Sequence, residues 1–255
     1  MGAGTWNITS LTGKEVEITK EMRKFKLDIL GISETRKQGK GNIKLTDGYT
    51  LYYSGIEPGQ RIKERVEGTE KNNTEEFYEQ LQMLIDKKKE GNNRIIILGD
   101  WNARVGNDKS LGLESMRQHG EEIINRNGRK MIEFCIINDL IIGNTFWDQP
   151  LDGKYTFVAE EREARSIIDY IVYTSDIQNK IEEVNTIREA ELATQHRLVK
   201  AIINDISVTI EKRKEYYRIP VHKLKEPERK FRYEENTEVA FKNAEQVRKG
   251  TLEEL

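Results

Sequence analysis

Short apolar runs separated by polar or glycine-rich stretches fill most of the chain as far as Asp205. Several runs have the length and the β-branched or aromatic content of strands. We therefore predict strands in GTWNI, LDILGIS, GYTLYYSG, RIIIL, LIIGNTF, YTFVA and IIDYIVYT. A last strand, HRLVKAIINDISV, is predicted to begin at His196, because apolar and polar residues alternate along it.

Apolar residues at helical spacing predict helices between these strands. One helix uses Ile18, Met22 and Phe25, and another spans GRKMIEFCIIND. A third is predicted to follow Thr74 as its N-cap, with an apolar face formed by Phe77, Leu81, Leu84 and Ile85. The polar stretch at residues 56–73 shows neither the strand nor the helix period and predicts a loop or an ordered fragment of a lost element. Residues 175–195 predict a long polar loop. Short strands interleaved with a few helices predict an α+β fold, a mixed-sheet sandwich covered by helices.

The character of the chain changes from Thr209 onward. Residues 211–233 carry nine Lys or Arg against four Glu, with Tyr216, Tyr217, Phe231 and Tyr233 interspersed. The end of the chain has the spacing of one amphipathic helix, with an apolar face of Val239, Phe241, Ala244 and Val247. We therefore predict a domain at residues 4–208 and a separate charged tail at residues 209–255.

The amino-acid composition limits which cellular compartment and which binding partners the protein can have. The 42 Lys and Arg against 44 Asp and Glu give a net charge of −2, which excludes a global basic field and leaves only local patches for nucleic acid. The single cysteine, Cys135, excludes an internal disulfide and fits a reducing compartment. No apolar run approaches the roughly 18 residues of a membrane span, and the start, MGAGTW, is unlike a signal peptide. We expect an intracellular protein, nuclear or cytoplasmic, without a membrane partner.

Polar residues end or interrupt several of the predicted strands. If these strand ends lie together, the following polar residues would face the mouth of one pocket: Asn7, Glu34, Asp100, Asn102, Asp169 and His196. The set holds acids, two amides and one histidine but no cysteine, so it suits Mg²⁺ better than zinc. Each has a plainer explanation, such as turn chemistry for Asn7 or a solvated strand end for Glu34. Asp100 and Asp169 are harder to explain in this way, because a carboxylate beside a buried strand requires a partner.

The ordered motifs TWNITSLTGKE, LDILGISETR, DGYTLYYSG, EEFYEQLQ, ILGDWNARVG, NRNGRKMIEFC, IIGNTFW, YTFVA, SIIDYIVYT and QHRLVKA resemble those of the endonuclease/exonuclease/phosphatase superfamily. Within it, they are similar to the apurinic/apyrimidinic endonuclease-like domains of non-LTR retrotransposons. They are closer still to the craniofacial development protein 2-like proteins, which look derived from such elements. The resemblance implies a four-layer α/β-sandwich that hydrolyses phosphodiesters with Mg²⁺, or alternatively Mn²⁺, and acts on DNA or RNA.

The resemblance also implies a role for each site residue. Glu34 would be the principal metal ligand, and Asn7 would orient the phosphate or a metal-bound water. Asp100 would position or deprotonate the attacking water, and Asn102 would hold a phosphate oxygen. Asp169 would hydrogen-bond to His196 and stabilise its charged form.

The chain departs from the family pattern in two places. The family's final Ser-Asp-His motif reads Thr194-Gln195-His196 here, so Gln195 replaces a carboxylate near the metal. A lost ligand of this kind costs about 10–100-fold in metal affinity or activity. Between Gly55 and Phe77, the family's central strands and its Tyr-Ala-Pro motif are missing, which predicts an internally truncated and less stable fold.

These departures leave a second hypothesis open, namely a catalytically decayed or domesticated relic. Its tail would bind single-stranded nucleic acid by charge and stacking, through Lys212, Arg213, Lys214 and Tyr217. The alternative for the tail is a solvated linker, and a skipped exon would explain the missing strands. The sequence predicts no oligomeric state.

Overall fold

The computed structural model describes residues 1–57, 70–89 and 93–204. The chain divides into two units, Met1–Ser207 and Val208–Leu255. The tail with its expected helix lies outside the described residues, as do Lys212, Arg213, Lys214 and Tyr217. The domain boundary at residue 208 and the binding role of the tail therefore stay predictions.

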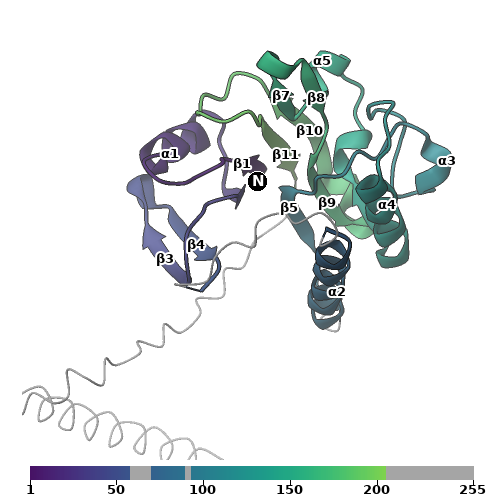
Figure 1. Ribbon diagram of the computed structural model, residues 1–255, viewed down its shortest axis with the longest axis horizontal. Coiled ribbons are helices and arrows are strands. Elements are labelled where there is room, and N and C mark those ends of the chain that lie inside the picture. Colours follow the sequence, from purple (N-terminus) through teal and green to yellow (C-terminus); the bar gives the residue numbers. More distant parts are fainter. Residues whose placement is uncertain (58–69, 90–92, 205–255) are drawn as a thin grey trace, which may run out of the picture. The chain divides into compact units, whose positions relative to one another are not determined.

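Two sheets form the centre of the first unit (Figure 1). The first has the order β10-β11-β1-β2 and is made of β10 (Ile181–Ile187), β11 (Leu198–Ile203), β1 (Gly2–Asn7) and β2 (Ile29–Ser33). Strand β1 runs parallel to β2 and antiparallel to β11. The second sheet has the order β5-β9-β6 and is antiparallel, with β5 (Ile96–Asp100), β9 (Asp169–Thr174) and β6 (Leu140–Ile142).

Two hairpins and several short turns complete the described secondary structure. The hairpins are β3 (Lys40–Lys44) with β4 (Thr50–Ser54), and β7 (Phe157–Ala159) with β8 (Ala164–Ser166). The short helical turns are α3 (Lys109–Gly112), α5 (Leu151–Lys154), η1 (Thr46–Gly48), η2 (Gly143–Thr145), η3 (Glu160–Arg162) and η4 (Ser175–Lys180).

The pleat of β9 shows how the layers pack. Ile171 and Tyr173 belong to the core between the two sheets, whereas Tyr170 and Val172 belong to the core on the other side of β9. Helices α2 (Glu70–Lys89) and α4 (Arg126–Asn138) cover that outer core. Helix α1 (Glu15–Lys24) covers the first sheet from the opposite side (Figure 1). The predicted α+β, four-layer sandwich is therefore confirmed.

A glycine allows the two sheets to approach each other closely. A Cβ atom added at Gly31 in β2 would lie 2.6 Å from the Cβ of Leu98 in β5, closer than real contacts permit. Adjacent sheets pack by interdigitating side chains, so the missing side chain at Gly31 leaves room for Leu98. This contact brings the outer strand of one sheet against the outer strand of the other.

Two predicted boundaries around helices and strands are wrong. Helix α2 begins at Glu70, so Thr74 is not its N-cap and Glu70–Asn73 is helical instead of a loop. Glu, Lys and Asn can extend a helix without adding to its apolar period. The predicted strand LIIGNTF ends at Ile142, where a 3₁₀ turn follows.

Three strands, β3, β8 and β10, were not predicted at all, and the last strand starts later than expected. Residues 175–195 contain β10, whose bulge between Ile181 and Glu183 interrupts the alternation. Strand β3 was missed because its lysines and its glycine are residue types that are uncommon in strands. Its antiparallel pairing with β4 keeps it in the extended conformation. Strand β11 begins at Leu198, and His196 lies just before it in an isolated bridge to Phe157.

The sandwich has an open side. Strands β2 and β5 are the last strands of their sheets on that side, and among the described residues neither pairs along its second edge. Their apolar side chains, including Leu30, Ile32 and Ile97, are only half-buried. Unpaired edges and uncovered apolar faces lower stability. No helix in the described ranges is long and apolar enough to cross a membrane.

We expect the protein to unfold below the range of about 45–65 °C in which mesophilic domains melt, because the open side leaves apolar surface in water. The measurement is a thermal melt followed by circular dichroism. A single cooperative transition inside that range would contradict the expectation.

Candidate active site

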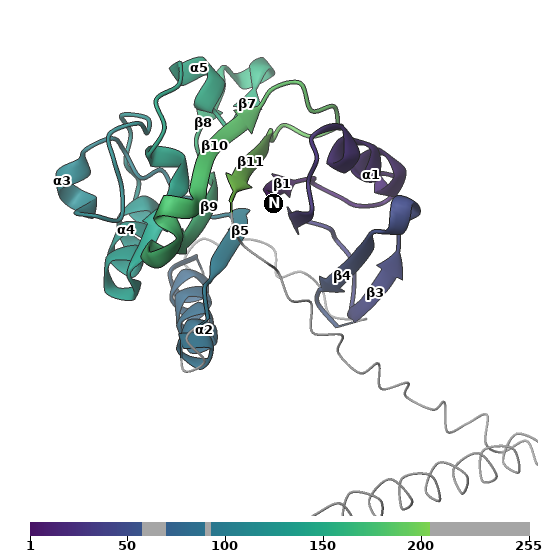
Figure 2. The same ribbon diagram turned by 180° about the vertical axis from the view of Figure 1, so that it is seen from behind.

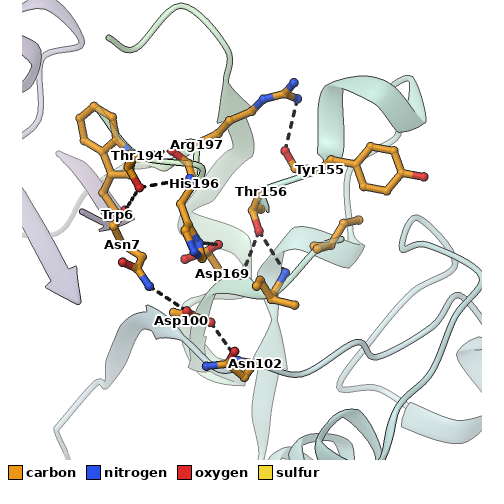
Figure 3. Close-up of polar contacts among 12 residues, drawn as sticks. Trp6, Asn7, Asp100, Asn102, Tyr155, Thr156, Asp169, Thr194, His196 and Arg197 are labelled. Carbon is orange, nitrogen blue, oxygen red and sulfur yellow. Dashed lines mark hydrogen bonds and ion pairs between the residues drawn. The ribbon is translucent and has the colours of Figure 1, made fainter. Parts of the chain in front are cut away.

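The strands of both sheets bring polar residues to one end of the sandwich. Asn7 is the last residue of β1, Glu34 follows β2, and Asp100 is the last residue of β5. Because β9 runs antiparallel to β5, its first residue, Asp169, lies directly opposite Asp100. His196 precedes β11, which runs antiparallel to β1, so it reaches the same end (Figure 3).

Asn7 connects two of the carboxylates. Its side-chain Nδ2 donates to Glu34 Oε1 at 3.0 Å and to Asp100 Oδ2 at 2.9 Å. Its Oδ1 accepts from the backbone N–H of Thr9 at 3.0 Å. The buried amide therefore turns its donor side to the carboxylates and arranges them, while its oxygen is used by the backbone.

Asp169 and His196 form a second pair. His196 Nδ1 lies 2.9 Å from Asp169 Oδ2, and the Asp169 side chain is fully buried. The ring of Phe157 stands edge-on to the imidazole with the two ring centroids 5.1 Å apart, which fixes the plane of the imidazole. Because Nδ1 is engaged by the carboxylate, Nε2 is the nitrogen left to exchange a proton with a substrate.

Burial and charge act on both members of this pair. Burial raises the pKa of Asp169, although the hydrogen bond and charge of His196 oppose the rise. Burial alone would lower the pKa of His196. The hydrogen bond to Asp169 and the negative charges of Asp169, Asp100 and Glu34 outweigh that effect, so the pKa of His196 is raised.

Asp169→Asn is expected to lower the pKa of His196, because it removes the main groups that favour the imidazolium and leaves the burial that disfavours it. The measurement is a histidine NMR titration, which is simple because the chain has three histidines. The resonance that disappears in His196→Ala identifies the residue. An unchanged or higher pKa in Asp169→Asn would contradict the expectation.

Four residues that sequence reasoning did not assign hold the pair in place. Thr156 Oγ1 accepts from the backbone N–H of both Ile168 and Asp169 at 3.0 Å. Asn144 donates to the carbonyl of Asp169 and accepts from the N–H of Ile171. The other two act around His196: Thr194 Oγ1 accepts from its N–H, and the Trp6 indole donates to its carbonyl.

The motifs IIGNTFW, YTFVA and TWNI contain Asn144, Thr156 and Trp6, respectively. Their place in these motifs was the only sequence signal that the three residues have a role in the site. Their contacts join segments far apart in the chain, so no local pattern could assign them a partner.

An ion pair between a buried glutamate and a half-buried arginine supports the segment that leads into Asp169. Glu121 is 3% exposed, and its Oε2 pairs with the Arg104 guanidinium. Its Oε1 accepts from the backbone N–H of Ile167 at 2.8 Å, and the Tyr170 hydroxyl donates to the carbonyl of Ile167 at 2.6 Å. Two side chains thus fix the backbone of one residue just before β9.

The remaining predicted residues lie at the mouth of the site or beyond it. The backbone N–H of Asn102 donates to Asp100 Oδ1 at 2.9 Å, and its side chain is exposed. Gln195 is also exposed, and its carbonyl accepts from the N–H of Val158. Within the described part of the chain, no hydrogen bond joins the Gln195 side chain to the other site residues.

The arrangement fits a divalent cation. Asp100, Asp169 and His196 each offer a ligand atom within 4.8 Å of the others. Asp169 Oδ1 is buried and has no hydrogen-bond partner among the described residues, so it is a carboxylate oxygen that a cation could satisfy. Glu34 adds a further carboxylate through Asn7. Carboxylate oxygens are ligands that divalent cations accept, and the cluster supplies several of them beside one imidazole.

The chain belongs to the endonuclease/exonuclease/phosphatase family, whose sequence profile matches residues 4–187. A relative, craniofacial development protein 2 of Bos taurus, is 29% identical over 240 residues, an alignment that covers 78% of this chain and 40% of that protein. The chain therefore spans about 40% of the length of this curated relative.

Two solved structures are similar in fold. The 3'-5' exonuclease NExo from Neisseria meningitidis gives a TM-score of 0.57 at 14% identity, covering 80% of this chain and 100% of that one. An AP endonuclease from Archaeoglobus fulgidus gives 0.53 at 13% identity, covering 81% and 100%. The resemblance derived from the sequence motifs is thus confirmed at the level of family and fold.

Proposed function

We propose that the protein is a Mg²⁺-dependent endonuclease that hydrolyses phosphodiester bonds in DNA or RNA and descends from a non-LTR retrotransposon. The observation that carries the proposal is the Asp169–His196 hydrogen bond of 2.9 Å, set directly beside Asp100. Membership of the family supports it, as do the nuclease names of two proteins that share the fold.

Each site residue has a task in this proposal. Asp100 accepts a proton from the attacking water or positions it, and Asn102 at the mouth holds a phosphate oxygen. Asp169 keeps His196 in one tautomer and stabilises its charged form, so that the ring can face the anionic phosphate. A bound Mg²⁺, held by Glu34 with Gln195 as a further candidate, would neutralise charge that develops on the phosphate. Asn7, a metal-site candidate on sequence grounds, would instead orient the carboxylates, because its side-chain oxygen already accepts from Thr9.

Gln195→Asp is expected to raise the affinity for Mg²⁺ by about 10–100-fold, because it adds a full negative charge at the mouth of the site. The measurement is isothermal titration calorimetry of Mg²⁺ into the wild type and the variant. Gln118→Asp, an exposed glutamine outside the site, is the matched control. Equal affinities for the two aspartate variants would show that position 195 does not reach the metal.

The test of the proposal is Mg²⁺-dependent nicking of plasmid DNA, of an abasic-site oligonucleotide and of RNA. Glu34→Ala is expected to abolish nicking, whereas Glu133→Ala, an exposed glutamate on α4, is expected to leave it unchanged. A folded wild-type protein that neither binds Mg²⁺ nor cleaves any of these substrates would overturn the proposal. The alternative, a decayed or domesticated relic, would then stand.

A further inference from the structure

The hairpin β3–β4 has one face that the core does not use. Its inner residues, such as Ile43 and Leu51, pack in the core beside α1. Figures 1 and 2 both place the hairpin next to α1 and away from α2 and α4. The outer face consists of six exposed residues, alternating along the two strands: Lys40, Asn42, Lys44, Thr50, Tyr52 and Ser54.

Tyr52 lies at the centre of this outer face. It is 78% exposed, although a tyrosine ring on a strand normally packs against neighbours. Asn42 stands directly opposite it, and the register places Lys40 and Lys44 on the two diagonals. Diagonal neighbours across a strand pair lie about 7–8 Å apart, so both ammonium groups can reach past the ring.

The hairpin is locally basic in a chain whose net charge is negative. Residues 35–46 hold four cations, Arg36, Lys37, Lys40 and Lys44, and no acid. Asp47, the first acid after them, is paired with Arg23 at 3.2 Å. The outer face therefore carries two positive charges around an exposed aromatic ring, and within residues 1–57, 70–89 and 93–204 neither forms an ion pair.

The hairpin is also joined tightly to the candidate active site. Residues 35–39 connect Glu34 directly to the start of β3. Two backbone hydrogen bonds of 2.7 Å, from Gly39 to Ile56 and from Gly55 to Gly39, close its base. A ligand on the outer face would therefore lie on a pre-formed support that begins at a site carboxylate.

We propose that this outer face binds a single-stranded segment of nucleic acid, with Tyr52 stacked on an unpaired base and Lys40 and Lys44 on the phosphates at either side. An aromatic platform between cations is how proteins hold single strands without reading their sequence. A duplex offers no free base face, and an acidic peptide or anionic lipid would use the lysines but gain nothing from the ring. The inference rests on the proposed function, because it specifies single-stranded nucleic acid as the form of substrate that the candidate active site would act on.

The test is fluorescence anisotropy with a labelled oligo-dT strand in EDTA, where no metal-dependent cleavage occurs. Tyr52→Ala is expected to weaken binding by about tenfold or more, and Tyr52→Phe to retain it. Lys40→Gln with Lys44→Gln is expected to reduce the slope of log K against log salt by about 1.4, as for two phosphate contacts. The matched control, Lys87→Gln with Lys88→Gln, removes two exposed lysines of α2 and is expected to change nothing.

The inference is overturned if the wild type does not bind oligo-dT, if Tyr52→Ala binds as well as the wild type, or if a dA·dT duplex binds with the same dependence on Tyr52. Hydrolysis of bis(p-nitrophenyl) phosphate, which is too small to reach the hairpin, tests the proposed function separately. Hydrolysis that persists in variants defective in oligo-dT binding supports both proposals. Binding without any hydrolysis supports the hairpin inference and counts against the nuclease.

Discussion

His196→Ala is expected to lower the rate of phosphodiester hydrolysis by about 10²–10⁴-fold, the usual contribution of a positioned acid–base residue. The His196 ring is held by Asp169 on one nitrogen and by Phe157 at its edge, so its remaining nitrogen has a fixed direction. Alanine removes the proton donor, and because the His196 side chain is only 10% exposed, circular dichroism is used to check that the variant keeps its fold. The measurement is the single-turnover rate on the best cleaved substrate.

Asp169→Asn and the double variant sharpen this test. If Asp169 acts through His196, the double variant is expected to be about as slow as His196→Ala alone, because residues that act as a unit are not additive. His119→Ala is the control, since His119 pairs with Asp148 outside the site. Additive losses in the double variant would mean that the two residues act independently.

Glu121→Ala is expected to destabilise the fold by about 2–3 kcal/mol, mainly because the buried N–H of Ile167 loses its acceptor, while the partly exposed Arg104 can be hydrated. The change leaves the Arg104 guanidinium without its partner and the buried N–H of Ile167 without an acceptor. In a sandwich with an open side, a loss of this size removes a large part of the free energy of unfolding. Urea unfolding followed by tryptophan fluorescence measures it.

Two further variants separate charge from packing. Glu122→Ala, on the exposed neighbour, is expected to have little effect on the urea midpoint. Glu121→Gln keeps an acceptor for Ile167 and is expected to fall between the wild type and Glu121→Ala. A midpoint in Glu121→Ala equal to that of Glu122→Ala would show that the ion pair is not needed.

The parts of the fold that depend on long apolar runs could be predicted from the sequence. Asp100 and Asp169 stood out because each is attached to a run of aliphatic residues, and the structure places them opposite each other. Strand β10 could not be predicted in this way, since it is an edge strand whose outward residues are polar and whose period a bulge breaks.

The supporting contacts of the site were beyond sequence reasoning for a different reason. Thr156 and Asn144 act by bonding to the backbone of β9, and a hydroxyl or amide can find such a partner almost anywhere. The backbone group to which each side chain bonds is decided only by how distant segments of the chain pack together in the fold. The Glu121–Arg104 pair is similar, because charged residues are usually exposed and nothing local marks this one as buried.

Asp100 lies on an outer strand, so any reaction at the candidate site depends on whether β5 stays paired with β9. Strand β5 pairs with β9 along one edge only among the described residues, whereas β9 is held on both sides. Outer strands detach at a lower free energy than central ones. We therefore expect the opening of β5 to govern the fraction of molecules with an assembled site, and warming to abolish the proposed activity while most of the core is still folded.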